Sequence, residues 1–157
     1  MRHVTQRATV GTPAREAYER LADFSRYPDL APSVLRVHVE DMAPDDLGRA
    51  RCRSSWEVTF RSGVLRWVEV DVFQPAAGRI DFAQESGDIE LFVGSWHVLP
   101  EGTGAAIEFS ADFDLGLPGL DTFLEPVAQR ALEDNVREIL LRLFPAAELM
   151  TEAEILQ

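Results

Sequence analysis

Residues 120–143 read LDTFLEPVAQRALEDNVREILLRL, and their pattern differs from that of the rest of the chain. When successive residues are placed about 100° apart around an axis, apolar side chains collect on one face and charged side chains on the other. The apolar face holds Leu124, Ala128, Ala131, Leu132, Ile139 and Leu143, and the opposite face holds Arg130, Glu133 and Arg137. The stretch therefore predicts one long amphipathic helix. Because proline fits the first turn of a helix, we expect the regular helix to begin near Pro126, after a looser turn over residues 119–124.

The chain between residues 34 and 113 carries strand patterns that are broken by turns at short, regular intervals. We expect six strands there, at Val34–Glu40, Arg49–Phe60, Val64–Phe73, Arg79–Gln84, Ile89–Leu99 and Ala105–Phe113. The stretch Arg61-Ser62-Gly63 is typical of a tight hairpin turn, and glycine also marks the turns near residues 48, 78, 87 and 102–104. Such spacing favours a mostly antiparallel meander.

The residues before this region predict a first strand at Arg2–Val10, followed by two short helices. Thr12 can cap the first helix and Pro13 fits its first position, while Tyr27-Pro28 redirects the chain around the second. A lone long helix beside an antiparallel sheet has to bury its apolar stripe against that sheet. The predicted class is therefore α+β with a helix-grip fold. About seven strands curve around the C-terminal helix, and a gap between helix and sheet leaves an internal apolar pocket.

Length and composition indicate one domain over residues 1–157, with its core at about 2–144. The net charge of −12 disfavours a nucleic-acid partner and an anionic membrane surface, and favours neutral small molecules or a protein with a basic docking patch. No apolar run approaches the roughly 20 residues of a membrane span, and the first residues lack the features of a secretory signal. We therefore expect a cytoplasmic protein without membrane insertion, as a monomer or homodimer.

Residues that bind metals or cofactors do not form a recognisable pattern. His3, His38 and His97 are scattered without the spacing of a metal site, and the single cysteine, Cys52, has no evident histidine partner. The chain contains no phosphate-binding loop, dinucleotide fingerprint or nucleophile-elbow motif. We therefore expect no cofactor.

The predicted strand Val64–Phe73 leaves open which of its faces is buried. One face carries Leu65, Trp67, Glu69, Asp71 and Phe73, and the other carries Arg66 and three valines. If the valine face packs in the core, the two carboxylates are solvated. If the Trp67 face points inward, Glu69 and Asp71 line a cavity, where desolvation favours their protonated forms and suits acid–base catalysis.

Further candidate pocket residues come from the other predicted elements. Asn135 lies in the apolar stripe of the long helix, either as a satisfied core amide or as a group that orients a ligand oxygen. Trp56, Trp96 and Phe109 are strand aromatics that suit either a core or a pocket wall. Tyr27, near the turn between the short helices, suits a hydroxyl at the pocket mouth or a packing role. We also expect Leu65, Phe73, Ile89, Ala128 and Leu132 in the wall.

Several short strings carry a resemblance to a known superfamily. They are ADFSRYP at residues 22–28, RWVEVDVF at 66–73, GSW at 94–96 and DNVREI at 134–139, in that order along the chain. Together they resemble the START/Bet v 1-like proteins, and within these the polyketide cyclase/dehydratase group, including the tetracenomycin-type aromatase/cyclases. The likeness extends from about Arg2 to Leu143.

This resemblance implies an aromatase/cyclase, a dehydratase-type lyase that takes a poly-β-ketone from an acyl carrier protein and promotes aldol closure and dehydration. It places Tyr27 at a pocket-mouth tryptophan, and Trp67, Trp96, Phe109 and Asn135 at pocket positions. An arginine with an acid–base role in those enzymes falls on Asp71, and a serine falls on Glu69. Because a guanidinium and a carboxylate have opposite charges, that mechanism does not transfer unchanged, and Asp71 or Glu69 becomes the candidate base.

Two other functions remain open from the sequence. The chain is also similar to coenzyme-Q carrier proteins, notably in Asp112-Phe113-Asp114-Leu115, which implies quinone or lipid binding without catalysis. A ribosome-associated role, known in the same superfamily, is disfavoured by the negative charge. Docking of an acidic carrier protein would need a basic patch, for which the candidates are Arg26, Arg36, Arg49, Arg51 and Arg53.

Overall fold

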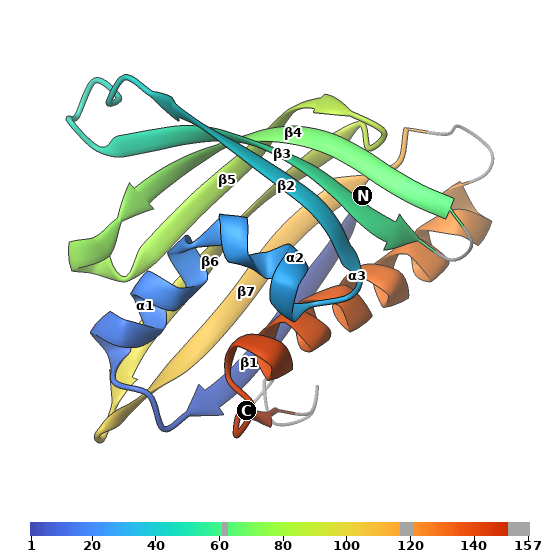
Figure 1. Cartoon of the computed structure of the whole chain (residues 1–157). Helices are drawn as coiled ribbons and strands as arrows, with labels where there is room; N and C mark the ends of the chain where they lie inside the picture. The colour runs from blue at the N-terminus through green and yellow to red at the C-terminus, as the bar shows by residue number, and fades with distance from the viewer. Residues whose placement is uncertain (61–62, 117–120, 151–157) are drawn as a thin grey trace.

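The computed structural model describes residues 1–60, 63–116 and 121–150, with the side chains of 121–123 left out of the description. The centre of the predicted turn at Arg61-Ser62 and the start of the looser turn, residues 119–120, lie outside the described residues. One antiparallel sheet runs in the order β2-β3-β4-β5-β6-β7-β1-β8 and curves around the long helix α3, as Figure 1 shows. The helix-grip fold is therefore confirmed.

The strands follow the predicted sites closely. They are β1 (Arg2–Val10), β2 (Val34–Met42), β3 (Ala50–Phe60), β4 (Gly63–Gln74), β5 (Arg79–Gly87), β6 (Leu91–Glu101), β7 (Gly104–Asp114) and β8 (Glu148–Leu149). The two-residue strand β8 raises the number of strands among the described residues from the expected seven to eight, because the chain after α3 turns back and pairs with Ala8 and Thr9 of β1. So short a strand carries no alternation pattern that could predict it.

Short helices cover one end of the sheet. They are α1 (Ala14–Ala22), the 3-10 turns η1 (Phe24–Arg26) and η2 (Pro75–Ala77), and α2 (Tyr27–Leu30). The expected start of α1 is wrong in detail: Pro13 is the residue before the helix, and no side chain caps its first turn. The carbonyl of Pro13 instead accepts the amide of Ala17 at 2.9 Å, so the backbone alone begins this helix.

The long helix α3 spans Asp121–Leu143 and packs along β1. The expectation that it begins near Pro126 is wrong, because Pro126 lies inside it. A proline this close to the start costs few intrahelical hydrogen bonds. Leu140 and Val136, which the predicted stripe omitted, are both buried, whereas the central stripe position Ala131 is only half-buried.

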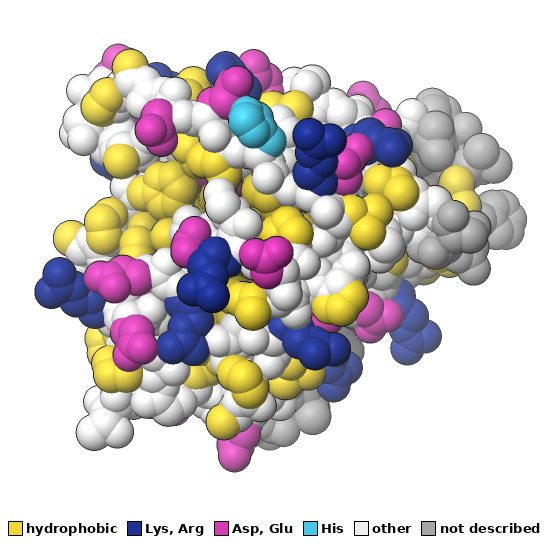
Figure 2. Space-filling view, in the orientation of Figure 1, with side chains coloured by type: hydrophobic (Ala, Val, Ile, Leu, Met, Phe, Trp, Pro, Cys, Tyr) yellow, Lys and Arg dark blue, Asp and Glu magenta, His cyan; other side chains and the backbone are white. Residues whose placement is uncertain are grey.

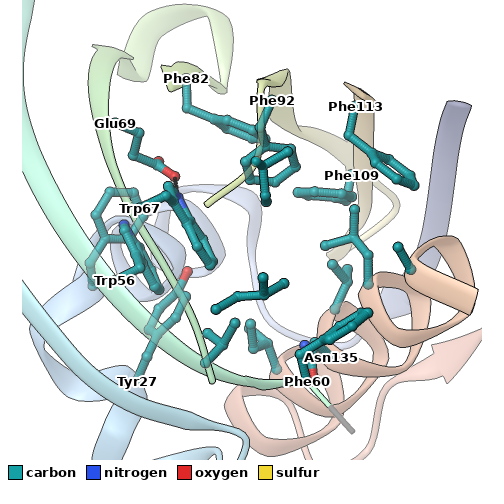
Figure 3. Close-up of a pocket in the computed structure, with 18 of the residues that line it drawn as sticks. Tyr27, Trp56, Phe60, Trp67, Glu69, Phe82, Phe92, Phe109, Phe113 and Asn135 are labelled. Atoms are coloured by element: carbon teal, nitrogen blue, oxygen red, sulfur yellow. Dashed lines mark hydrogen bonds between the residues drawn. The ribbon is translucent and has the colours of Figure 1, made fainter. Parts of the chain in front are cut away.

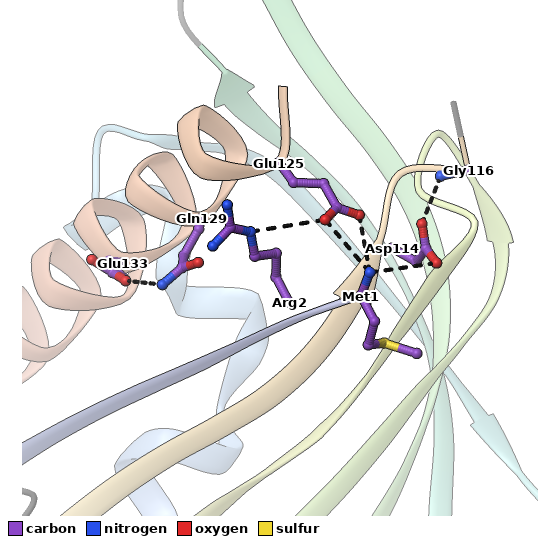
Figure 4. Close-up of polar contacts among 7 residues, drawn as sticks. All are labelled: Met1, Arg2, Asp114, Gly116, Glu125, Gln129 and Glu133. Carbon is purple, nitrogen blue, oxygen red and sulfur yellow. Dashed lines mark hydrogen bonds and ion pairs between the residues drawn. The ribbon is translucent and has the colours of Figure 1, made fainter. Parts of the chain in front are cut away.

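Ion pairs hold the first turns of α3 against the sheet. The buried carboxylate of Glu125 lies 3.2 Å from the Met1 amino group and 3.8 Å from Nε of Arg2, and the same amino group lies 3.8 Å from Asp114 at the end of β7 (Figure 4). Because the oxygens of Glu125 face these cations, its burial does not leave the charge unpaired. Among the described residues, neither α3 nor any shorter helix has the length and hydrophobicity of a membrane span.

The pairing of β3 with β4 positions the candidate catalytic residues. Trp56 lies opposite Trp67, Ser54 opposite Glu69 and Cys52 opposite Asp71. Alternate residues of a strand point to one face, so these side chains all project toward α3 from two neighbouring strands. On the far side of the sheet, Trp96 of β6 lies opposite Phe109 of β7 in the same way.

Candidate active site

A cavity of about 90 Å³ lies between the inner face of the sheet and α3 (Figure 3). Its wall is aromatic and aliphatic with few polar groups. The lining residues are Phe24, Tyr27, Trp56, Val58, Phe60, Leu65, Trp67, Glu69, Phe82, Ile89, Phe92, Trp96, Phe109, Phe113, Leu115, Ala128, Leu132, Asn135, Val136 and Ile139. Concave apolar sites with a few convergent polar groups are the usual form of small-molecule sites.

Most of the residues predicted for the pocket lie in this wall. They are Tyr27, Leu65, Trp67, Glu69, Ile89, Trp96, Phe109, Ala128, Leu132 and Asn135. Two do not reach it: Phe73 packs against Phe24, with ring centroids 5.8 Å apart, and Asp71 lies behind the wall. The alternation of β4 carries Phe73 past the end of the cavity, toward the short helices.

The structure decides which face of β4 is buried. Trp67, Glu69 and Asp71 are 9%, 5% and 0% exposed, whereas the valines between them are only half-buried. The Trp67 face therefore points inward, and both carboxylates are buried. Hydrophobicity alone could not reveal this, because the apolar valines occupy the outer face and the charged side chains the inner one.

Some residues of the cavity wall were not predicted, although the alternation of side chains along the strands indicates several of them. They are Phe24, Val58, Phe60, Phe82, Phe92, Phe113, Leu115, Val136 and Ile139, together with Trp56, which the sequence left as core or wall. Several lie an even number of positions from a predicted residue of the same strand and so point to the same face. These are Phe92, which shares a face with Trp96 on β6, and Phe113, which shares a face with Phe109 on β7. Applying the two-residue period from each predicted residue would have found these.

The aromatic side chains pack against one another around the cavity. Trp56 and Trp67 stack with ring planes 4° apart and centroids 6.0 Å apart, and Phe92 meets Trp67 edge-on at 5.6 Å. Phe109 contacts Trp96 at 4.8 Å. Aromatic pairs in such geometries contribute about 0.5–1.5 kcal/mol each beyond the burial of their area, so the wall is held in shape without a ligand.

Both buried carboxylates receive hydrogen bonds from neighbouring side chains. Oε1 of Glu69 accepts the indole N–H of Trp67 at 2.7 Å. Oδ2 of Asp71 accepts the hydroxyl of Ser54 at 2.5 Å and the thiol of Cys52 at 3.4 Å. Ser54 in turn accepts the indole N–H of Trp56 at 2.8 Å. Each tryptophan therefore packs its ring in the cavity wall. The indole N–H of Trp67 donates directly to Glu69, and that of Trp56 donates to Ser54, which in turn donates to Asp71.

Burial governs the ionisation of this pair. Desolvation raises the pKa of Glu69 well above its usual range, and the neighbouring Asp71 raises it further. Desolvation also raises the pKa of Asp71, although the hydrogen bonds that it accepts from Ser54 and Cys52 oppose this rise. Burial and the nearby Asp71 raise the pKa of Cys52 too, so its thiol stays protonated and acts as a donor.

Tyr27 is a buried wall residue whose hydroxyl is already in use. The hydroxyl donates to the carbonyl of Leu21 at 2.5 Å, and the ring lies edge-on to Trp56 at 5.6 Å. Only 1% of Tyr27 is exposed, so the structure places it in the interior and not at an open pocket mouth. Its bond to the backbone anchors α2 against the end of α1.

Asn135 faces the cavity from α3, on the side opposite Glu69 (Figure 3). Its Nδ2 donates to the carbonyl of Thr59 at 3.4 Å, which links α3 to the end of β3. The amide therefore combines a weak structural bond with access to the cavity. A ligand in the cavity would have polar groups at two opposite points, Glu69 and Asn135.

Histidine, cysteine and carboxylate side chains do not gather into a metal-binding cluster anywhere in the described residues. His3 instead lies 2.7 Å from Asp112 on the sheet surface, and His38 lies 3.8 Å from Glu40. These four side chains do not contribute to the cavity wall.

Known proteins share this fold and parts of this sequence. Over 107 residues, 67% of this chain, the sequence is 31% identical to the granaticin polyketide synthase bifunctional cyclase/dehydratase of Streptomyces virginiae, and the chain spans 34% of that protein's length. The crystal structure of TTHA0849 from Thermus thermophilus matches with a TM-score of 0.80 at 23% identity, over 90% of this chain and 94% of that one.

The Zhui aromatase/cyclase from Streptomyces sp. R1128 matches with a TM-score of 0.79 at 20% identity, over 90% of both chains. At these identities the two solved structures establish the fold. The family model described as "Polyketide cyclase / dehydrase and lipid transport" matches residues 10–140, a range that includes all the described residues of the cavity wall. The chain therefore belongs to the polyketide cyclase/dehydrase and lipid transport family.

Proposed function

We propose that this protein is an aromatase/cyclase, which binds a poly-β-ketone intermediate in the cavity and promotes its regiospecific aldol cyclisation and dehydration. The observation that carries this proposal is the position of Glu69, the one carboxylic acid among the described residues of a wall that, apart from Asn135, is aromatic and aliphatic. A wall of this composition suffices to bind an apolar molecule. A buried carboxyl costs free energy of desolvation, and proton transfer to a bound ligand gives a reason for its presence.

The size of the cavity limits how much of the substrate can enter it. An apolar protein cavity of roughly 150 Å³ holds benzene, and the cavity here measures about 90 Å³, so a forming ring would have to widen it on binding. We infer that it receives the segment that closes, while the rest of the poly-β-ketone lies outside. Flat walls such as the Trp56–Trp67 stack would hold that segment bent and planar, so that the attacking carbon approaches the carbonyl in a near-attack geometry.

Glu69 and Asn135 supply the polar contacts for this chemistry. In the aldol step Glu69 would give its proton to the oxygen of the carbonyl under attack and take one from the carbon between two carbonyls, whose electron pair forms the new C–C bond. In the dehydration step the new hydroxyl leaves as water. Asn135, across the cavity, would donate to a carbonyl oxygen and fix which carbons meet. Asp71 lies behind Glu69 and would act through it.

The relatives support the same branch of the family. The granaticin protein is named as a bifunctional cyclase/dehydratase, and a solved structure with this fold is named as an aromatase/cyclase. Neither name favours the alternative of a quinone or lipid carrier.

Delivery of the poly-β-ketone by an acidic acyl carrier protein would need exposed arginines that are not already engaged in ion pairs. Arg49 pairs with Asp45 at 2.7 Å and Arg53 with Glu85 at 2.8 Å, and Nε of Arg51 donates to a backbone carbonyl. Figure 2 shows acidic and basic side chains interspersed over one face of the molecule. Arg26 and Arg36 are exposed and have neither an ion pair nor a side-chain hydrogen bond within the described ranges, so we propose these two for docking.

The test is a reconstitution with a minimal polyketide synthase and its carrier protein, with products compared by mass spectrometry. We expect a new cyclised and dehydrated product when the protein is present, and its loss with the Glu69→Gln variant. The matched control is Glu108→Gln, on the outer face of β7. Unchanged products with the wild-type protein, together with a co-purifying quinone or lipid, would replace this proposal with the carrier function.

A further inference from the structure

The second oxygen of Asp71 has no visible partner. Asp71 is fully buried, and its Oδ2 accepts two hydrogen bonds, from Ser54 and Cys52. Its Oδ1 is buried without a hydrogen-bond partner in the described part of the chain. A buried carboxylate oxygen without a donor is costly, and the proton of a neighbouring carboxylic acid is the natural donor to relieve that cost.

Glu69 is placed to supply that proton. It lies two residues before Asp71 on the same inward face of β4, and it is itself 5% exposed. Two ionised carboxylates so placed would repel each other beside a wall that contains no arginine or histidine among the described residues. One proton between them removes this repulsion and satisfies the orphan oxygen, as in other carboxyl pairs that share a site.

We propose that Glu69 and Asp71 hold one proton between them, with Glu69 as the neutral acid that faces the cavity and Asp71 as the buried anion that accepts its hydrogen bond. The donors around the pair fit this arrangement. Asp71 receives hydrogen bonds from Ser54 and Cys52, which stabilise an anion, whereas Glu69 receives one, from Trp67. The negative charge therefore resides on the carboxylate that is more deeply buried but has more hydrogen-bond donors.

This arrangement gives Glu69 and Asp71 separate roles in catalysis, and these roles rest on the proposed function. In dehydration the Glu69 proton passes to the departing hydroxyl oxygen, the C–O bond breaks and water leaves. The adjacent carbon gives its proton to the Glu69 carboxylate, and the electron pair of that C–H bond becomes the new double bond. The pair ends with the one proton with which it began. Glu69 is the catalytic residue, and Asp71 is a positioning residue that keeps the proton on Glu69.

Infrared difference spectroscopy of the purified protein tests the shared proton without any turnover. We expect the carbonyl stretch of a protonated carboxylic acid at neutral pH, retained in Glu108→Gln. The band should be absent in Glu69→Gln, which removes the acid. In Asp71→Asn the band should titrate away at a lower pH than in the wild-type protein, because Glu69 stays buried but loses the neighbouring charge that retains its proton. Both changes are nearly isosteric, and circular dichroism would confirm that each variant is folded.

The possible outcomes distinguish a failure of the shared proton from a failure of the proposed aromatase/cyclase function. Absence of the band from the wild-type protein, or its persistence in Glu69→Gln, would overturn the shared proton. If the band behaves as expected while the reconstituted synthase gives the same products with and without the protein, the shared proton stands and the enzyme assignment fails. In an active enzyme, Asp71→Asn should move the basic limb of the pH–rate profile to lower pH, whereas a purely structural role would lower the rate equally at all pH values.

Discussion

The side chains of Glu69 and Asp71 point inward from alternate positions of β4, yet only Glu69 reaches the cavity wall. Asp71 lies behind it, among Ser54 and Cys52 of the neighbouring strand. The hairpin of β3 and β4 therefore provides both the acid that meets a ligand and the polar residues that stabilise its partner. The acid–base behaviour of the site depends on contacts within this hairpin.

Glu69→Gln should abolish most of the turnover while leaving ligand binding largely intact. The amide keeps the shape of the side chain but cannot exchange a proton, and a general acid–base group contributes about 10²–10⁴-fold to the rate. Initial rates in the reconstituted synthase measure the loss, and quenching of tryptophan fluorescence by bound product measures affinity. Full activity of the variant would remove Glu69 from the mechanism.

Stability should depend on pH with a sign set by this pair. Folding raises the pKa of both Glu69 and Asp71. Their contribution to the free energy of unfolding is therefore fully present below the pKa values of the unfolded state, about 4. It is lost as the pH rises through the pKa values of the folded state. Glu69→Gln should then stabilise the protein at about pH 8 by at least ~1 kcal/mol, or roughly 2–4 °C in Tm, and by much less near about pH 4.

Thermal unfolding of wild type and variant at a series of pH values checks this prediction. The difference between the two proteins isolates the pair from the other titrating groups, and Glu108→Gln supplies the surface control. A stabilisation that is largest in acid would contradict the expected sign.

Trp67→Phe should raise the pKa of Glu69 further. The indole N–H donates to Oε1 of Glu69 at 2.7 Å and lowers the pKa of that carboxyl, so its removal favours the protonated form. The shift is opposite in direction to that expected for Asp71→Asn. Titration of the carboxylic acid infrared band measures it, with Trp96→Phe as the control, because Trp96 lines the same cavity but donates to neither carboxylate.

Asn135→Leu should broaden the product mixture and weaken substrate binding. The side chains have similar size, but leucine cannot donate a hydrogen bond to a substrate oxygen. A lost hydrogen bond of about 1–1.5 kcal/mol corresponds to roughly a tenfold rise in apparent KM. The variant also loses the 3.4 Å bond to Thr59, so its Tm is measured in parallel. A single unchanged product would assign Asn135 a structural role alone.

Gly94→Ala should destabilise the fold. A Cβ at this position of β6 would collide with the carbonyl oxygen of Ser110 and with Ala111 on the neighbouring strand β7. Overpacking of this kind typically costs about 1–3 kcal/mol. Chemical denaturation measures the loss, and Gly11→Ala is the matched control, because an added Cβ there meets nothing within 4 Å. Equal stability of the two variants would contradict the predicted collision.

The sequence by itself determined the order of elements and most of the cavity wall. Period-two strands, the glycine-rich turns and the apolar stripe of residues 120–143 are local patterns, and local patterns fix secondary structure and the faces that can be buried. The strings around Trp67, Trp96 and Asn135 added the resemblance that the matching family model confirms over residues 10–140. Leu65, Ile89 and Phe109 were placed in the wall by the same reasoning.

Only the tertiary structure decided which face of β4 is inside. Both of its faces are mixed, so the free energy of burying Glu69 and Asp71 depends on donors from other residues, Ser54 and Cys52 on β3 and the indole N–H of Trp67. The pairing of β3 with β4 sets those contacts, and it appears in no single segment. The two-residue strand β8 and the continuation of α3 ahead of Pro126 likewise depend on neighbours distant in sequence, β1 and the cations that face Glu125.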